Sequence, residues 1–357
     1  MQNKPTAYPR PPRQRPPWQI AVIDIVLIGL CLVIFALFDH VIPSAGQKVV
    51  YTAPVVSGPT AAPTDAIAPE DGADAQAAEV LSEPSAPTEA PAAAPAVGDF
   101  SDKFADKFTD GEIIQTETSY QSANLNVNIY WYKDYLGTKP QMAFVEDIYI
   151  RNIECLRGVF AQDTFGHSIS ENVLSMAQRT GVVCAINADF CGYGSAGICI
   201  RNGVLYRREY QPGEEVLIIY RDGTMRVFPK GSDVDVDQVM ADGAWQSFSF
   251  GPSLLDVAGN LRTEGYEKVN HDPRTFIGMI EPGHYLFVVA DGRQKGYSEG
   301  LTYYEAAVLA QRLGCTVAYN LDGGKTSQMT FMGRYVNQPY NGGRDTSDLI
   351  CIADAQP

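Results

Sequence analysis

The chain has 357 residues, of which 45% are hydrophobic, and it carries a formal net charge of −15. Because acidic residues are in excess and no large basic patch is visible, the composition disfavours nucleic acid as a partner. The chain has four histidines, and its seven cysteines include no CxxC pair. The sequence therefore gives no support for a zinc site.

The N-terminal 39 residues have the pattern of a signal-anchor. Residues 1–17 form a basic tail without an acidic residue, and residues 20–38 are almost entirely apolar. At about 1.5 Å per residue, such a stretch matches a hydrocarbon core of roughly 30 Å, which predicts a transmembrane helix over 18–39. The positive-inside rule then places the N-terminus in the cytoplasm and the rest of a single-pass membrane protein outside. A cleaved signal peptide is the alternative, but its apolar core usually spans only about 7–15 residues.

Residues 40–99 are predicted to be a disordered stalk. The stretch from 49 to 99 is rich in Ala, Pro and Thr, and it has eight Asp or Glu residues with no Lys or Arg. Such a composition cannot bury enough apolar surface to offset the entropy of ordering. The remaining residues, 100–357, are long enough for one sizeable globular domain.

The first part of that domain shows helix and strand signals. Three phenylalanines spaced by four, at 100, 104 and 108, predict a short helix that packs an aromatic stripe. Strands are predicted over 125–132 and 143–151. Ser168 and Glu171 have the spacing of a capping box, which predicts the start of a helix that ends at Gly181.

The second part is predicted to alternate hairpins with helix–strand units. Asn202-Gly203 and Asp222-Gly223 are strong hairpin signals. Period-2 and period-3.6 patterns predict the flanking elements: strands over 198–201, 204–207, 216–220, 224–228, 274–280, 285–290 and 349–353, and a helix over 301–313. This mixture predicts an α/β to α+β fold in which helices pack on a mixed sheet, instead of a uniformly wound parallel sheet.

One phrase occurs twice, at 177–189 and at 310–322. Seven of its thirteen positions are identical, and each copy reads as helix, glycine, short buried strand and Asn-x-Asp. Because side chains alternate along an extended chain, Asn187 and Asp189 face the same way, as do Asn320 and Asp322. Asn and Asp also begin ordinary turns. The repetition favours a shared pocket at the strand ends, where ligands tend to bind in α/β sheets.

Two known functional motifs are incomplete in this sequence. Ser298 lies in a Gly-x-Ser-x-Gly sequence, but the nucleophile-elbow pattern requires a later histidine, and all four histidines precede it. Gly323-Gly-Lys-Thr-Ser327 looks like the end of a P-loop, yet Tyr319 occupies the position of the first glycine. A turn before a helix is the better account of the first motif.

Polar residues remain at several predicted strand ends. Carboxylates can act as acid, base or nucleophile at a sugar carbon, whereas arginine and glycine-rich backbone suit a phosphate. Together these types predict a sugar-phosphate site, formed by Asn187, Asp189, Arg274, Thr275, Asp291, Arg293, Asn320, Asp322, Gly323, Gly324 and Ser327. Structural interpretations stay open: Arg274 as a surface ion pair, Asp291 in an ordinary turn, and Glu305 on an exposed helix face.

Several motifs in one order resemble the phosphodiester glycosidase family over roughly 125–353. The matching segments are Asn187-Ala-Asp-Phe190, Ser195-Ala-Gly-Ile198, Pro273-Arg-Thr275, Ala290-Asp-Gly-Arg293, Gly296-Tyr-Ser-Glu-Gly-Leu-Thr302 with Glu305, and Asn320-Leu-Asp-Gly-Gly324 with Ser327 and Met329. The resemblance implies a hydrolase that frees a sugar from a sugar-1-phosphodiester on an extracellular glycan or polysaccharide of the cell envelope. A phosphomonoester stays on the other partner.

The resemblance also implies roles for individual residues. Asp189 and Asp322 would be the catalytic carboxylates, with Asn187 and Asn320 positioning the sugar or the carboxylates. Arg274 and Arg293 would bind the phosphate. The supporting members would be Glu305, Asp291, Thr275, Gly323, Gly324 and Ser327. No cofactor follows with certainty, and a divalent metal ion stays open.

Three positions depart from the family pattern. Ala188 stands where a glycine is usual, Cys191 where an aromatic residue is usual, and Lys325 interrupts a Gly-Gly-Gly-Ser-Ser-Thr sequence. Lys325 either adds a phosphate ligand or blocks a close backbone approach that glycine permits. Two rival functions therefore stay open: a surface glycan-binding protein without turnover, and a structural envelope protein in which the Asn and Asp residues hold a metal ion.

The cysteine pair that brackets a glycine-rich loop also has two interpretations. Cys191 and Cys199 either form a disulfide that staples this loop or stay as small buried thiols.

Overall fold

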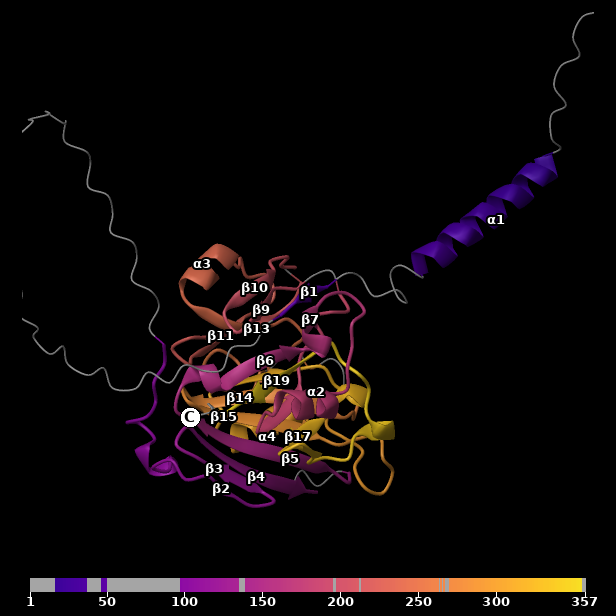
Figure 1. Ribbon diagram of the computed structural model, residues 1–357. Coiled ribbons are helices and arrows are strands. Elements are labelled where there is room, and N and C mark those ends of the chain that lie inside the picture. Colours follow the sequence, from indigo (N-terminus) through magenta and orange to yellow (C-terminus); the bar gives the residue numbers. More distant parts are fainter. Residues whose placement is uncertain are drawn as a thin grey trace, which may run out of the picture.

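The computed structural model describes residues 17–36, 46–49, 97–134, 139–194, 197–211, 213–262, 264, 266 and 270–354 (Figure 1). Helix α1 (Pro17–Ala36) coincides with the predicted membrane span. Among the described helices, however, none is long and apolar enough to cross a membrane. The transmembrane helix over 18–39 stays a prediction from the sequence, and residues 37–39 of it lie outside the described residues.

Most of the predicted tail and stalk lies outside the described residues, namely 1–16 and 50–96. A short described piece forms strand β1 (Gln47–Lys48), which pairs with β7 (Thr164–Phe165). The Val49 amide donates to the Asp163 carbonyl at 2.8 Å, and the Gly98 amide donates to the Arg221 carbonyl at 2.6 Å. These pieces of the predicted stalk thus hydrogen-bond to the globular domain.

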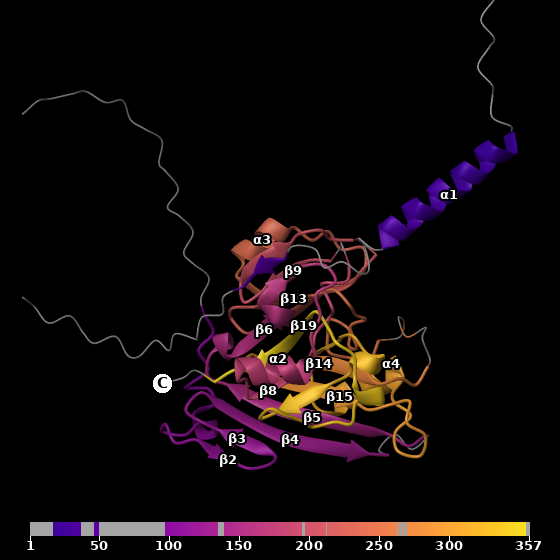
Figure 2. The ribbon, with the colours of Figure 1, turned by 45° about the vertical axis from the view of Figure 1, so that its right-hand side comes forward.

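Two antiparallel sheets form the centre of the domain (Figure 2). The seven-stranded sheet has the order β16-β14-β15-β5-β4-β3-β2, with β16 (Val317–Asn320), β14 (Arg274–Glu281), β15 (His284–Ala290), β5 (Met142–Ile150), β4 (Leu125–Lys133), β3 (Ser119–Gln121) and β2 (Ile114–Gln115). The five-stranded sheet has the order β18-β17-β8-β19-β6, with β18 (Arg334–Tyr335), β17 (Met329–Phe331), β8 (Cys184–Asn187), β19 (Asp348–Ile352) and β6 (Leu156–Phe160).

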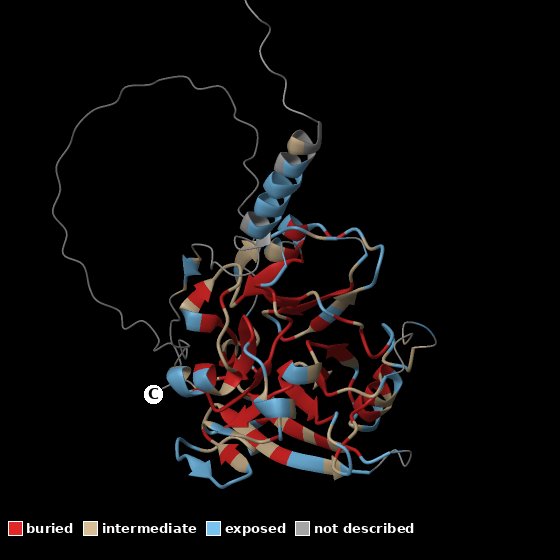
Figure 3. Ribbon diagram, turned by 90° about the vertical axis from the view of Figure 1, so that its right-hand side faces the viewer, coloured by how far each residue is buried: buried red, intermediate tan, exposed pale blue. Residues whose placement is uncertain are grey.

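The inner faces of the two sheets share one hydrophobic core. Strands of the larger sheet contribute Leu125, Ile148 and Phe287, and strands of the smaller sheet contribute Ile186 and Ile350. All five side chains are fully buried. Burial of this area is the main force that holds the sheets face to face, and Figure 3 shows buried residues throughout the interior.

One helix covers the outer face of each sheet. Helix α4 (Tyr303–Arg312) packs its alanines against β5, β14 and β15 of the larger sheet. Helix α2 (Val173–Thr180) packs Val173 and Met176 against β6, β8 and β19 of the smaller sheet. The layers are therefore helix, sheet, sheet, helix, an arrangement that covers both faces of the central strands of each sheet.

A third, smaller layer lies beside the five-stranded sheet. It contains the sheet β12-β11-β13 and the hairpin of β9 (Cys199–Arg201) and β10 (Val204–Arg207). The sheet consists of β12 (Met225–Phe228), β11 (Val216–Tyr220) and β13 (Ala244–Phe248), and α3 (Val236–Ala241) packs in the same cluster. The short 3₁₀ helices are η2 (Ala105–Lys107), η3 (Ile153–Cys155), η4 (Ala161–Asp163), η5 (Gly324–Thr326) and η6 (Tyr340–Gly342).

The α+β class is confirmed, with packed helices and hairpins. Every ladder among the described strands is antiparallel, which removes the α/β alternative. The hairpin at Asn202-Gly203 is confirmed, since both residues have positive φ, at 55° and 76°. The hairpin at Asp222-Gly223 and the pairing of 274–280 with 285–290 are also confirmed.

Two local predictions are wrong. The capping box is absent, because Asn172 caps α2 through a bond from the Leu174 amide, while Glu171 accepts from the Gln162 amide at 2.8 Å. The phenylalanine-spaced segment forms only the single turn η2 instead of a longer helix, although Phe100 and Phe104 are buried as expected. In both places, tertiary contacts outweigh a local pattern.

Candidate active site

The two repeated segments meet at the ends of β8 and β16, which belong to different sheets. The Asn187 side-chain amide donates to the Asp322 carbonyl at 2.7 Å, and the Asp322 amide donates to the Ala188 carbonyl at 3.2 Å. Gly181 and Gly314, which end the preceding helices, have positive φ of 65° and 84°. The sequence-based expectation that the two copies converge is thus confirmed.

Asn187 joins the two sheets from a fully buried position. Its Oδ1 accepts hydrogen bonds from the Thr275 hydroxyl at 2.9 Å and from the Gln328 amide at 3.2 Å. Since its donors and its acceptor all have protein partners, Asn187 holds the strand ends in place. Thr275, on β14, shares this positioning role.

Asp322 lies at the edge of the cluster. Its Oδ1 accepts from the Gly323 amide at 2.8 Å, and its Oδ2 accepts from Arg344 Nη2 at 2.7 Å. Burial raises the pKa of the Asp322 carboxyl, while the Thr326 hydroxyl and the Arg344 guanidinium oppose that rise. The Asp322 side chain is 10% exposed, against 4% for that of Asp189, so Asp322 is the less buried of the two carboxylates.

Asp189 lies deeper, with a fully buried arginine. Arg201 donates to Asp189 at 2.7 Å and to Asp348 at 2.6 Å through the same nitrogen, and its side chain is 1% exposed. The other Asp189 oxygen accepts from the Ser249 amide at 2.8 Å. Burial raises the pKa of Asp189 to about 6, because one guanidinium shared with Asp348 only partly offsets the loss of solvent.

Asn320 occupies the position equivalent to Asn187 but has other contacts. Its side-chain amide donates to the Gly251 carbonyl at 2.8 Å and to the Leu321 carbonyl at 2.9 Å. Its Oδ1 is buried and has no hydrogen-bond partner within the described part of the chain. Asn320 therefore keeps a buried acceptor unsatisfied beside the loop at 249–252.

Arg274 is buried, which excludes the interpretation as a surface ion pair. Its guanidinium stacks over the Tyr303 ring at 4.0 Å from the centroid, and it donates to the Leu301 carbonyl at 3.0 Å and to the Asn270 carbonyl at 3.1 Å. Burial lowers the pKa of Arg274. These bonds fix Arg274 beside the cluster and use two of its donors.

The loop at 323–327 packs against Pro273 and Arg293. A Cβ on Gly323 would lie 2.9 Å from the Pro273 carbonyl, and Gly324, with φ +67°, donates to the same oxygen at 2.9 Å. A Cβ on Gly324 would lie 3.3 Å from the Arg293 guanidinium. Close packing and the left-handed backbone thus account for both glycines.

Three cationic residues lie on or beside this loop. Arg293 donates to Asp272 at 2.8 Å, Arg344 pairs with Asp322, and Lys325 is exposed on η5. The Ser327 hydroxyl is buried without a hydrogen-bond partner among the described residues. Arginine guanidiniums and glycine-rich backbone are groups that bind phosphate well.

Asp291 connects the loops that carry Tyr297 and Asn337. Asp291 accepts from the Asn337 side chain at 2.8 Å, from the Gln338 amide at 2.9 Å and from the Tyr297 hydroxyl at 2.8 Å. Burial raises the pKa of its carboxyl despite these bonds. Asp291 is therefore more than an ordinary turn residue.

Glu305 completes a capping box with Thr302 and lies 3.1 Å from His271 Nε2. Burial opposes ionisation, but the bonds from Thr302 and the imidazole lower the pKa of Glu305. Ser298, the serine of the rejected nucleophile motif, is fully buried and donates to the Asp291 carbonyl at 2.6 Å.

Sequence reasoning missed Arg201, Arg344 and Asp348. Arg201 offered one signal in the sequence, because it ends the apolar run 198–201. The structure buries its side chain fully. Arg344 and Asp348 belong to a loop and a strand whose position depends on tertiary contacts. The described cysteines are all free thiols, and Cys191 and Cys199 pack together with Phe160.

Comparisons with known proteins agree with this geometry. Residues 180–353 match the phosphodiester glycosidase family. The SPbeta prophage-derived uncharacterized protein YomE of Bacillus subtilis (strain 168) is 36% identical over 190 residues, which are 50% of this chain and 29% of that protein. The chain thus spans less than a third of that relative.

One solved structure with a TM-score above 0.5 has a similar fold. The catalytic domain of zebrafish N-acetylglucosamine-1-phosphodiester alpha-N-acetylglucosaminidase, auto-inhibited by its pro-peptide, has a TM-score of 0.53 and 19% identity, over 68% of this chain and 88% of that one. A hypothetical protein from Synechocystis has a TM-score of 0.43 and 14% identity, over 65% and 62% of the two chains. Through residues 180–353, the chain belongs to the phosphodiester glycosidase family.

Proposed function

We propose that the domain hydrolyses a sugar-1-phosphodiester, releasing the free sugar and leaving a phosphomonoester on the other partner. The observation that carries this proposal is that the backbone segments that carry Asp189 and Asp322 meet at the joined ends of two sheets, with an arginine paired to each acid. The family and the fold support a hydrolase of the phosphodiester glycosidase type.

The charges at the site suit the transition state of this reaction. When the bond from the anomeric carbon to the phosphate oxygen breaks, positive charge develops on the sugar ring and negative charge on the leaving phosphate. In the proposal, the Asp322 carboxylate faces the ring, because it is the carboxylate nearer to solvent. Arg293, Arg344 and Lys325 bind the phosphate from the loop at 323–327.

Asp189 is the second carboxylate of the proposed mechanism. With a pKa of about 6, it can exchange a proton near neutral pH, as an acid or base needs to do. A water molecule supplies the hydroxyl group to the sugar, and its proton passes through a carboxylate to solvent or to the phosphate. Asn187 and Thr275 hold the strand ends that carry both acids.

The proposal is tested with the purified full chain and a panel of sugar-1-phosphodiesters, by chromatographic detection of free sugar and phosphomonoester. Asp322→Asn and Asp189→Asn are each expected to lower kcat/KM by about 10² or more. Asp237→Asn is the matched control, because Asp237 also pairs with an arginine but is exposed. Full activity in both site variants would refute the proposal.

The two rival functions give other results in the same assay. Saturable glycan binding without product on any phosphodiester would favour a binding module. Among the described residues, the metal-ion alternative has one candidate set, Asp189, Cys191 and Asp348, whose ligand atoms lie within 4.8 Å of one another. Arg201 already pairs with both carboxylates of this set and occupies an oxygen of each, which argues against a cation there.

The extracellular location stays a prediction from the sequence. We propose that the domain acts on envelope glycans, and protease treatment of intact cells tests this. Degradation of the domain without cell lysis is expected, and full protection would contradict it.

A further inference from the structure

Three aromatic side chains gather beside Asp189. The ring centroid of Phe190 lies 4.8 Å from that of Tyr193, in a stacked arrangement, and 6.3 Å from that of Phe250, at an angle of 71°. Tyr193 is 41% exposed and Phe250 is 38% exposed. We call Phe190, Tyr193 and Phe250 the aromatic platform. Exposed aromatic residues that cluster on a soluble domain commonly mark a binding surface.

The backbone ties this platform to the candidate catalytic carboxylate. Phe190 directly follows Asp189, and Phe250 directly follows Ser249, whose amide donates to Asp189 at 2.8 Å. The loop that carries Phe250 is held from the second repeat as well, since Asn320 donates to the Gly251 carbonyl at 2.8 Å. A ring that rests on the platform would therefore have a defined position relative to Asp189.

Arg207 holds the described part of the loop that carries Phe190 and Tyr193. Arg207 donates to three carbonyls of this loop, those of Cys191 at 2.8 Å, Gly194 at 2.7 Å and Gly197 at 2.7 Å. Phe190 itself has φ of +61°, a left-handed conformation that strains a non-glycine residue and is concentrated at ligand sites. Rigid loops of this kind lower the entropic cost of binding.

The platform borders a polar cavity. Phe250 lines a hollow of about 510 Å³ together with Tyr303, the residue over which Arg274 stacks. The other lining residues are Gly213, Glu214, Glu215, Lys230, Gly251, Pro252, Arg262 and Glu264. This volume lies within the usual range of roughly 300–1,000 Å³ for small-molecule sites.

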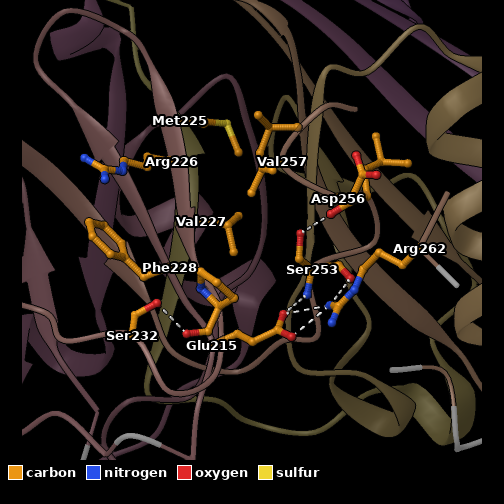
Figure 4. Close-up of a pocket in the computed structure, with 13 residues that line it drawn as sticks. Glu215, Met225, Arg226, Val227, Phe228, Ser232, Ser253, Asp256, Val257 and Arg262 are labelled. Atoms are coloured by element: carbon orange, nitrogen blue, oxygen red, sulfur yellow. Dashed lines mark hydrogen bonds and ion pairs between the residues drawn. The ribbon is translucent and has the colours of Figure 1, made fainter. Parts of the chain in front are cut away.

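Hydrogen-bonding capacity remains in this cavity. Glu214 Oε2 is buried and has no hydrogen-bond partner among the described residues. Figure 4 shows the neighbouring cavity, which shares Glu215 and Arg262 and has apolar walls of Met225, Val227 and Val257. Both cavities combine charged groups with aromatic residues, but only the one that Phe250 lines includes a member of the aromatic platform.

From this combination we propose that the aromatic platform is the sugar subsite and that it selects a pyranose. The C–H face of a pyranose is apolar and stacks on aromatic rings, whereas its hydroxyl groups need hydrogen-bond partners such as the acids and cations of the cavity. This inference rests on the proposed function and adds the residues that determine which sugar is accepted. Tyr193 and Phe250 are then specificity-determining residues, and Arg207 is a positioning residue.

The kinetic test uses substitutions at the two exposed members. Tyr193→Ala and Phe250→Ala are each expected to raise KM for a sugar-1-phosphodiester roughly tenfold, with a smaller change in kcat. Phe250→Tyr should retain the wild-type KM because it keeps the ring. Trp131→Ala is the control, since Trp131 is 60% exposed but lies on β4 and lines a different cavity.

A binding test separates this inference from the proposed function. Free monosaccharides are titrated into the Asp322→Asn chain by calorimetry or ligand-observed NMR, with and without Phe250→Ala. Sugar binding that weakens about tenfold on removal of the ring supports the platform, even if no hydrolysis is ever detected. Normal hydrolysis with an unchanged KM in both alanine variants overturns the platform and leaves the hydrolase assignment intact.

Discussion

The two copies of the repeated segment place the same residue types in different surroundings. Asp189 shares a fully buried arginine with Asp348, whereas Asp322 pairs with the half-exposed Arg344. Asn187 has all its polar atoms bonded, but Asn320 leaves its Oδ1 unpartnered within the described part of the chain. The polar groups of the first copy are thus more completely paired inside the protein, whereas the second copy keeps an unpartnered acceptor and an acid whose arginine is half exposed.

The largest expected difference concerns the two arginines. Arg201→Met leaves two buried carboxylates without their shared cation, which should lower the free energy of unfolding by about 3–5 kcal/mol. Arg344→Met removes a partly solvated ion pair and should cost at most about 1 kcal/mol. Chemical denaturation of the full chain measures both values. Equal losses would mean that the two copies do not differ in the way described.

The two asparagines provide the next comparison. Asn187→Ala leaves the Thr275 hydroxyl, the Gln328 amide and the Asp322 carbonyl without a partner between the sheets, so a loss of about 2–3 kcal/mol is expected. Asn320→Ala removes two bonds to backbone carbonyls and should cost about 1 kcal/mol. Denaturation midpoints give the ranking. A larger loss for Asn320→Ala would contradict the view that the first copy is the more completely paired one.

The pH dependence of stability tests whether burial raises the pKa of Asp189 in the first copy. The pKa of Asp189 rises from an ordinary 3.8 to about 6 on folding. Its contribution to stability is therefore complete below about pH 3.8 and is lost as the pH rises through about 6. Asparagine does not titrate, so the melting temperature of Asp189→Asn minus that of the wild type should increase between pH 4 and pH 7.

Asp237→Asn is the control for this measurement because the shift has the opposite sign. Arg208 lowers the pKa of Asp237, whose contribution is present above its unfolded pKa. The same melting-temperature difference should therefore stay flat or decrease with pH for this variant. A flat profile for Asp189→Asn as well would contradict the burial-driven shift.

The parts of the fold that sequence predicted are those set by short-range chemistry. The Asn202-Gly203 turn was predictable, because two adjacent positive φ values demand these residue types. The face-to-face pairing of two sheets was not, since it depends on contacts between Ile186 and Phe287, far apart in sequence. The local signal at Ser168 failed because Asn172 took the capping position.

The candidate site was predictable to a similar extent. The repeat itself indicated that Asp189 and Asp322 would converge, and glycines marked the close approach of the loop at 323–327. The sequence did not reveal which arginine pairs with each acid and affects its ionisation. Arg201 and Arg344 come from other elements, so no spacing within the repeat could reveal them.

The smallest expected effect concerns the glycine loop of the second copy. Gly324→Ala places a methyl group 3.3 Å from the Arg293 guanidinium and forces alanine to adopt a φ of +67°. Gly314→Ala, the matched control, has a φ of +84° but no atom within 4 Å of the new methyl group. Both variants should lose about 1 kcal/mol of unfolding free energy from backbone strain alone.

Activity distinguishes these two glycine variants. Only Gly324→Ala should raise KM for a sugar-1-phosphodiester, by about twofold to fivefold, because only its methyl group displaces an arginine that the proposal assigns to the phosphate. Steady-state kinetics at matched folded fraction makes the comparison. If Gly314→Ala raised KM equally, the effect would come from general loosening of the second copy, and the phosphate role of Arg293 would lose its support.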